Sequence, residues 1–361
     1  MPAYFAGMTP APSISPGLPV ELGEIERRLG ELWEQSEAAK VRASLVNLVV
    51  CSEAPDAIET NTPLLAALAS EHAFRALLVQ ADPRAPGSAV RAWITAHCHM
   101  RGTGQKEICS EQIAFRLEGS AAGQLASIVF SHLDSDLPLY LWWQGDLPDD
   151  PDPQLWSWVD RLLVDATAWK NPARQFARLR QIEELGRGRL ALGDLAWTRL
   201  FHLFYAAAHI FDLPAARRRL GRLQKIEIRH APGQRITALE LLGWMASRFG
   251  WTLETGGTSF RRPDGGTAAF DVREEPGAAA AISSVRFDFG DGAASVRRDE
   301  AGEFYILDFA AEGAEPCSQM MPAGREKTAD ILLSELSRSS RHPLYWPAIH
   351  AIEPLLGNAA D

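Results

Sequence analysis

The run from Leu137 to Pro148, LPLYLWWQGDLP, is the sequence feature that most constrains the fold. It is short, rich in aliphatic and aromatic residues, and closed by a Gln-Gly-Asp turn signal, which is typical of a buried central strand. Because neighbouring strand residues point to opposite faces, its two adjacent tryptophans are expected on opposite faces of the sheet. Ligands and partners of open α/β sheets gather at the C-terminal ends of strands. The candidate functional residues at this strand end are Trp142, Trp143, Gln144, Gly145 and Asp146.

Similar apolar runs alternate with helical patterns through the first half of the chain. Strands are predicted at residues 43–51, 74–80, 89–100, 106–117, 137–143 and 161–165, and helices at 21–40, 62–72, 119–133, 153–159 and 172–187. This alternation predicts an α/β N-terminal domain, with a mixed sheet of about five or six strands that includes a β-hairpin, and helices on both faces.

The pattern changes after the glycine-rich segment GRGRLALGD, which places a domain boundary near residues 188–194. Helices are predicted at 194–211, 234–249, 323–337 and 344–355, with Asp194 as the N-cap of the first and Thr237 with Glu240 as a capping box for the second. Short strand-like runs at 222–230 and within 251–310, separated by turn residues, indicate antiparallel sheet. We therefore expect a flexible Pro-rich tail over 1–20, an α/β domain over 21–190 and an α+β domain over 191–361.

Composition limits the partners of the protein. The formal net charge is −10, which is poorly suited to binding nucleic acid or an anionic membrane surface. No apolar run approaches the roughly 18 residues that a membrane-spanning helix needs, and the N-terminus lacks a secretory signal pattern. The four cysteines are widely spaced, as in a reducing compartment. We expect a cytoplasmic protein that binds neither nucleic acid nor membrane.

Motifs for common catalytic chemistry are not found in the sequence. It has no Walker loop, no dinucleotide fingerprint after the first predicted strand, and no GxSxG nucleophile elbow. The expectation is therefore no catalytic residues, no cofactor and no metal. Two alternatives stay open: an enzyme acting on a phosphorylated sugar through Asp134, Asp136 or Asp165, and a small-molecule sensor domain.

Cys98 and Cys109 are predicted to face each other across the hairpin. A turn at Thr103-Gly104 pairs residues whose numbers add up to 207, which brings these two cysteines opposite each other and sends His97 and His99 to the other face. This register is compatible with three interpretations: two buried small side chains, a redox-active pair, or a metal site. The Cys and His side chains lie on opposite faces, which argues against a zinc site.

Tryptophans concentrate around the predicted strand ends. Five of the 11, at positions 142, 143, 156, 158 and 169, fall within 28 residues. Core packing explains some of them, and protein-binding hot spots are also rich in tryptophan. At least one member of this cluster is expected to be exposed as an anchor for a partner.

Several segments together resemble one family. These segments are residues 42–50 (RASLVNLVV), 109–113 (CSEQI), 141–148 (LWWQGDLP, similar to LWWxGDxP), 161–165 (RLLVD) and 194–200 (DLAWTRL, similar to DLxWTRL). In order and spacing the similarity covers roughly residues 25–250, and it identifies the chain as a member of the glucose-6-phosphate dehydrogenase assembly protein family, OpcA.

The resemblance implies a non-catalytic protein that binds glucose-6-phosphate dehydrogenase, promotes its active oligomer and acts in the oxidative pentose phosphate pathway. It adds Asp165, Asp194, Trp197, Thr198 and Arg199 to the candidate partner-binding or motif residues. Some members of the family respond to thioredoxin through cysteines, so Cys98 and Cys109 are a candidate redox pair. After DLxWTRL the family continues with a Thr-Pro-Trp-Arg-like stretch, whereas this chain has FHLF at 201–204.

Overall fold

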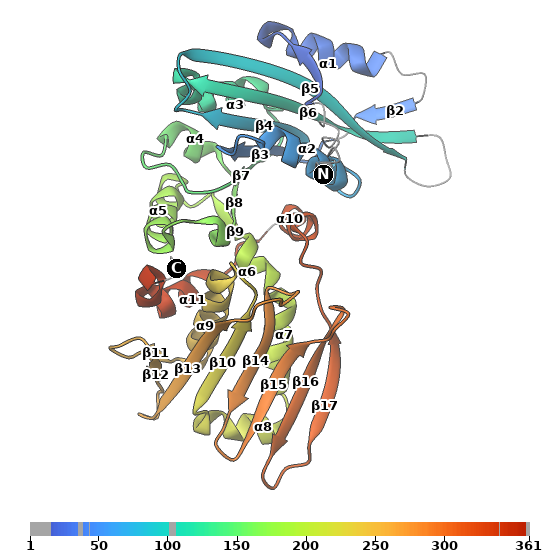
Figure 1. The fold of residues 1–361 in the computed structure, drawn as a ribbon. Coiled ribbons are helices and arrows are strands. Elements are labelled where there is room, and N and C mark those ends of the chain that lie inside the picture. Colours follow the sequence, from blue (N-terminus) through green and yellow to red (C-terminus); the bar gives the residue numbers. More distant parts are fainter. Residues whose placement is uncertain (1–15, 35–38, 43, 101–105, 339, 359–361) are drawn as a thin grey trace, which may run out of the picture. The chain divides into compact units, whose positions relative to one another are not determined.

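The computed structural model describes residues 16–34, 39–42, 44–100, 106–338 and 340–358. The chain divides into two compact units, Met1–Trp142 and Trp143–Asp361 (Figure 1). These units are defined by contacts within the folded chain. The domain limits expected from the sequence, 21–190 and 191–361, stay a prediction.

The first unit is built around long strands with short helices between them. Its elements are β1 (Leu18–Val20), η1 (Leu22–Glu24), α1 (Ile25–Glu34), β2 (Ala39–Arg42), β3 (Asn47–Ser52), α2 (Ala57–Ala69), β4 (Arg75–Asp82), β5 (Ser88–Met100), β6 (Lys106–Gly119), η2 (Ser120–Gln124), α3 (Leu125–His132) and β7 (Leu139–Trp143).

The strands of this unit follow the order β1-β5-β6-β4-β3-β7, and β2 pairs with β6. β3, β4 and β6 run parallel, whereas β5 and β6 form the predicted antiparallel hairpin. Every residue of β3 and the first six residues of β4 are buried, so both faces of these central strands are covered. The mixed sheet predicted from the sequence is confirmed.

The second unit begins with alternating helices and short strands and continues into a large sheet. Its first elements are α4 (Pro153–Trp158), β8 (Arg161–Val164), η3 (Ala166–Ala168), α5 (Pro172–Leu185), β9 (Ala191–Asp194), α6 (Leu195–Arg199), α7 (Phe201–Ile210), α8 (Pro214–Arg219), η4 (Leu220–Arg222), β10 (Lys225–His230) and α9 (Arg235–Phe249). The remaining elements are β11 (Thr252–Leu253), β12 (Ser259–Arg261), β13 (Thr267–Glu274), β14 (Ile282–Asp288), β15 (Gly292–Arg298), β16 (Phe304–Ala311), β17 (Cys317–Pro322), α10 (Thr328–Leu336), α11 (Tyr345–Ile352) and η5 (Glu353–Asn358).

The large sheet has eight strands in the order β11-β12-β13-β10-β14-β15-β16-β17 (Figure 1). It is mixed, because β10 and β13 are parallel while the other pairs are antiparallel. Helix α7 packs against β15 and β16, and α9 packs against β10 and β13. The buried side chains of these strands therefore lie beneath α7 and α9.

Several sequence predictions need correction. Among the described residues between 18 and 194 there are nine strands, where five or six were expected. The missed strands, β1, β2 and β9, have only three or four residues each and carry little periodicity. The helix predicted at 194–211 is broken at Leu200 into α6 and α7. The capping box is wrong, since α9 begins at Arg235 after Gln234, and the Glu240 side chain is buried.

Candidate functional site

The WWQGD turn is held by its own hydrogen bonds. Trp143 donates from Nε1 to the carbonyl of Asp146 at 2.9 Å, and the ring lies 5.8 Å from that of Trp156. Gly145 has a φ of 85°, a left-handed conformation that a side chain would strain. The Asp146 carboxylate accepts from the backbone N–H of Lys170 at 3.1 Å. The family-like residues therefore fix the path of the chain after β7.

Asp194, the first residue of the DLxWTRL motif, is a buried junction of three elements. As predicted it caps α6, with Oδ1 accepting from the N–H of Ala196 at 2.9 Å. The same oxygen accepts from the N–H of Ala166 at 3.1 Å, and Oδ2 accepts from the hydroxyl of Tyr345 at 2.7 Å. This carboxylate thus joins η3, α6 and α11 within the second unit.

Asp165 and Arg199 form a two-pronged ion pair beside this junction. The Arg199 nitrogens donate to the two Asp165 oxygens at 2.6 and 3.2 Å, and Asp165 also accepts from the backbone and hydroxyl of Thr167. Burial opposes the charge of Arg199, yet the hydrogen bonds and charge of Asp165 raise the pKa of the guanidinium. Asp165 is therefore committed to internal partners, which argues against its use on a phosphorylated substrate.

Glu240 completes the group as a buried acid. Burial raises its pKa well above 4.5, and the neighbouring Asp194 raises it further. Burial together with the charge of Asp165 raises the pKa of Asp194 to about 6. Among the described residues no N–H or O–H group donates to the Glu240 carboxyl. The two raised pKa values mean that these neighbouring carboxyls keep their protons to higher pH than they do in the unfolded chain.

A second polar cluster surrounds Glu335 on α10, whose side chain is fully buried. It accepts from Arg161 at 3.0 Å and from the hydroxyl of Thr198 at 2.6 Å, and it hydrogen-bonds Nε2 of His342 at 3.0 Å. Burial opposes its ionisation, but the His342 hydrogen bond and the nearby positive charges hold the pKa of Glu335 below 4.5. Gly193 makes room for this carboxylate, because a Cβ there would lie 2.4 Å from Oε2.

The DLxWTRL residues are thus brought together, and each has a structural partner. Trp197 is buried and packs edge-on against the ring of Tyr345 with centroids 5.4 Å apart. We name the side chains of Asp165, Asp194, Arg199, Glu240 and Tyr345 the Asp194 cluster. From the sequence, Glu240 was expected only in a capping box and Arg161 only in a family-like segment, while Tyr345 and Glu335 were not expected in a site. An acidic residue inside an apolar helix, as in ITALELL and DILLSEL, was the available signal.

The remaining sequence candidates have different surroundings. The backbone N–H and carbonyl of Asp134 are bound by the side chain of Asn47, as in a structural turn. Over the described ranges, no group of three or more His, Cys, Asp or Glu side chains is placed to hold a metal ion. Trp142 is buried, whereas Trp158 is 59% exposed and is the exposed member of the tryptophan cluster.

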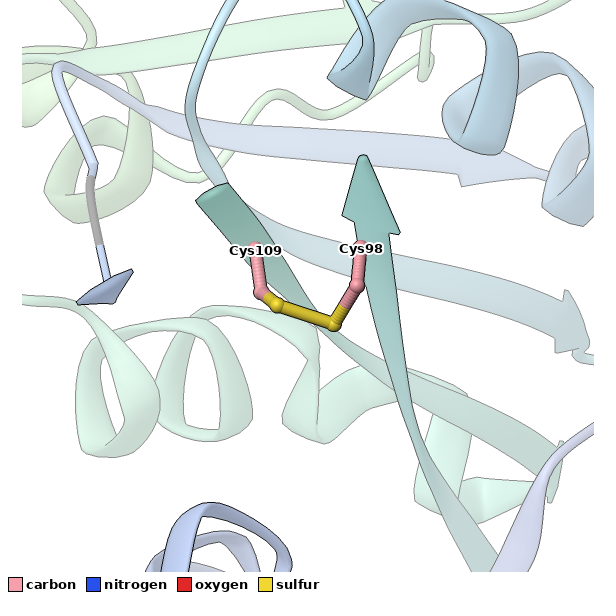
Figure 2. The surroundings of a disulfide bond; sticks show 2 residues. All are labelled: Cys98 and Cys109. Carbon is pink, nitrogen blue, oxygen red and sulfur yellow. A yellow bond between two sulfur atoms is a disulfide. The ribbon is translucent and has the colours of Figure 1, made fainter. Parts of the chain in front are cut away.

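Cys98 and Cys109 are paired in the predicted register and form a disulfide (Figure 2). Cys98 lies on β5 and Cys109 on β6, and their Cα atoms are 4.1 Å apart. On the other face of the hairpin the ring of His97 is buried and hydrogen-bonds Gln112 at 2.9 Å. The hairpin turn and the His99 side chain lie outside what the structure describes. Redox activity of this pair stays a prediction.

Together the fold and the clusters define a class: a two-domain protein with a mixed sheet and helices in each part, in which the motif residues form buried structural clusters. Residues 65–181 match the family described as glucose-6-phosphate dehydrogenase subunit N-terminal domain, and residues 190–349 match its C-terminal domain. The chain therefore belongs to the OpcA family of glucose-6-phosphate dehydrogenase assembly proteins.

Curated relatives agree with this assignment. The chain is 31% identical over 166 residues to the OxPP cycle protein OpcA of Synechocystis sp., a match that covers 45% of this chain and 34% of the relative. The corresponding protein of Nostoc punctiforme is 28% identical over 169 residues, covering 45% and 35%. The chain thus spans about a third of the length of these relatives.

Solved structures show distant likeness. A levoglucosan dehydrogenase in complex with NADH and L-sorbose has a TM-score of 0.44 at 9% identity, covering 88% of this chain and 97% of that one. An NAD-binding oxidoreductase from Klebsiella pneumoniae has a TM-score of 0.46 at 9% identity, covering 88% and 96%.

In the part of the chain that the structure describes, none of the helices is long and apolar enough to cross a bilayer.

Proposed function

We propose that this protein binds glucose-6-phosphate dehydrogenase in the cytoplasm and promotes its active oligomer without catalysing a reaction itself. The observation that carries the proposal is the match of both family domains, which together extend from residue 65 to residue 349. The proposed place of action is the oxidative pentose phosphate pathway, which the names of the curated relatives also indicate.

The surroundings of the motif residues support an indirect role. Asp165, Asp194 and Arg199 are occupied by one another and by backbone groups, so their side chains stabilise the second unit. A non-catalytic activator acts by binding the active form of its partner more tightly than the inactive form, and the difference in affinity shifts the population.

Trp158 is the proposed contact residue near the WWQGD turn. It follows the buried Trp156 on α4, and its ring is largely exposed. Tryptophan is enriched among residues that carry most of the binding energy at protein interfaces. We expect Trp158→Ala to weaken the complex with little change in the melting temperature, whereas Trp156→Ala would unfold the region around it.

The test mixes the purified protein with the dehydrogenase from the same organism. Complex mass is followed by light scattering, and NADP reduction is followed at limiting glucose 6-phosphate. A larger complex together with a higher rate supports the proposal. If neither quantity changes at micromolar protein, the proposal is wrong. NADP reduction by this protein alone would instead indicate an enzyme.

A further inference from the structure

Helix α7 carries apolar residues on more than one face. Leu203, Ala206, Ala207 and Ile210 are buried, as expected for the face that packs on β15 and β16. A second set with the same helical spacing is formed by Phe201, Phe204, Tyr205 and Ala208. A helix that is apolar around most of its circumference is normally covered on all sides. In this unit, however, the second set is partly or fully exposed, with Tyr205 at 72%.

This second face borders a groove of about 370 Å³. Its walls include Trp197 and Trp244, and the Trp244 ring stacks on Phe204 with centroids 4.6 Å apart. Residues 340–344 also line it. The groove lies within the second unit, and its lining includes Phe201 and Phe204 of the FHLF stretch. In this stretch the sequence differs from the Thr-Pro-Trp-Arg-like pattern named above.

The lining of the groove is basic. Arg338 and Arg341 are among the residues that line it, and these lining residues include no Asp or Glu. The Arg338 guanidinium lies 4.5 Å from the centre of the Phe201 ring, and its Nε approaches Glu335 at 3.8 Å. Among the described residues, Nε of Arg338 has no hydrogen-bond acceptor. In a chain with a net charge of −10, an arginine-bordered aromatic groove is a locally basic site.

We propose that this groove docks a segment of the partner enzyme in which an apolar or aromatic side chain is flanked by carboxylates. The inference rests on the proposed function and specifies the chemistry of the contact. The apolar side chain would enter between Phe204, Tyr205 and Trp244, and a carboxylate would pair with Arg338. Buried aromatic and arginine anchors of this kind carry most of the binding energy at interfaces, and complementary charge increases the association rate.

Exposed positions allow a test that does not disturb the core. Ala208 is exposed at the groove, so Ala208→Glu and Ala208→Lys form a matched pair of similar size and opposite charge. Tyr205→Ala removes the exposed ring. Met320→Ala, at an exposed apolar residue on β17 outside the groove, is the control. Affinity for the dehydrogenase is measured by biolayer interferometry at low and high salt, and the melting temperature of each variant is recorded.

The proposal expects Tyr205→Ala to weaken binding about tenfold or more. Ala208→Glu should bind at least tenfold more weakly than Ala208→Lys at low salt, with the difference decreasing at high salt. All variants should keep the wild-type melting temperature, and Met320→Ala should bind like the wild type. A photo-crosslinking residue at position 205 should label a dehydrogenase segment that contains Asp or Glu next to an apolar residue.

Other outcomes overturn the inference in distinguishable ways. If the wild type binds and the groove variants bind equally well, the groove is not the contact, although the proposed function stands. If Ala208→Glu binds better than Ala208→Lys, the occupant is basic. If the variants change the mass of this protein alone, the occupant is a second copy. If the wild type neither binds nor activates the dehydrogenase, the proposed function fails and the docking proposal fails with it.

Discussion

The substitution Glu240→Gln tests whether the Asp194 cluster holds a proton. In the unfolded chain both acids lose their protons near pH 4, whereas burial raises the pKa of Asp194 to about 6 and raises that of Glu240 well above 4.5. The folded protein therefore binds more protons than the unfolded chain above pH 4. The free energy of unfolding that these two acids contribute is fully present below their pKa values in the unfolded chain. It is lost as the pH rises through their higher pKa values in the folded protein.

The magnitude follows from the same values. Raising the pKa of Asp194 from 3.8 to about 6 corresponds to roughly 3 kcal/mol of unfolding free energy lost by pH 8. Glutamine at position 240 removes one acid, keeps the shape and presents an N–H to Asp194. The loss at Asp194 comes from burial and Asp165, so it stays in the variant. The variant lacks the further loss that the raised pKa of Glu240 causes in the wild type. We therefore expect the variant to match the wild type near pH 5, to exceed it at pH 8, and to have a shallower dependence of the unfolding free energy on pH.

The assay is urea unfolding followed by circular dichroism at several pH values from 5 to 8. Hydrogen exchange of peptides from α6 and α9 adds a local readout. Glu184→Gln, at an exposed glutamate on α5, is the matched control and should leave the pH profile unchanged. If Glu240→Gln keeps the wild-type pH slope or is less stable than the wild type at pH 8, Glu240 does not hold a proton in the folded protein and the reasoning is wrong.

Three further predictions concern other parts of the chain. Arg161→Met should destabilise the second unit by about 3–5 kcal/mol, because it removes the buried arginine that pairs with Glu335. Urea unfolding measures this, and wild-type stability would refute the role of the pair. Reduction of the disulfide between Cys98 and Cys109 should lower the free energy of unfolding by about 2–3 kcal/mol, because the bond closes a loop between cysteines 11 residues apart. A Cys98→Ser variant should lose no further stability when dithiothreitol is added. Trp143→Phe should lower the free energy of unfolding by about 1 kcal/mol, because it removes the hydrogen bond from Nε1 to the carbonyl of Asp146. If the variant instead binds the dehydrogenase more weakly and keeps its stability, Trp143 contacts the partner.

The sequence predicted elements with strong local signals. The strand ending at Trp143, the hairpin register that pairs Cys98 with Cys109, and the N-cap at Asp194 are all confirmed, because each depends on residues close in sequence or on a fixed alternation. The mixed character of the first sheet followed from the alternation of strands and helices.

The missed features depend on distant residues. Thr237 and Glu240 have the spacing of a capping box, yet tertiary burial brings the glutamate to Asp194, and no local rule anticipates that. The glycine-rich segment that contains β9 indicated a domain boundary. In the structure its Gly193 lies against the Glu335 carboxylate, where a side chain would not fit. The Asp194 cluster could be predicted only as separate motif residues, because Tyr345 lies 151 residues further along the chain.

These long separations affect how the protein is made. Arg161 leaves the ribosome 174 residues before Glu335, which at 5–20 residues per second is roughly 10–35 s. During that interval the guanidinium and the Asp194 carboxylate remain without the C-terminal groups that bury them, so the second unit cannot reach its final packing. A chain cut short before α10 would contain every family motif and still lack the partners of both polar clusters. The segment that contains α10 and α11 therefore has to be synthesised before either polar cluster can be completed.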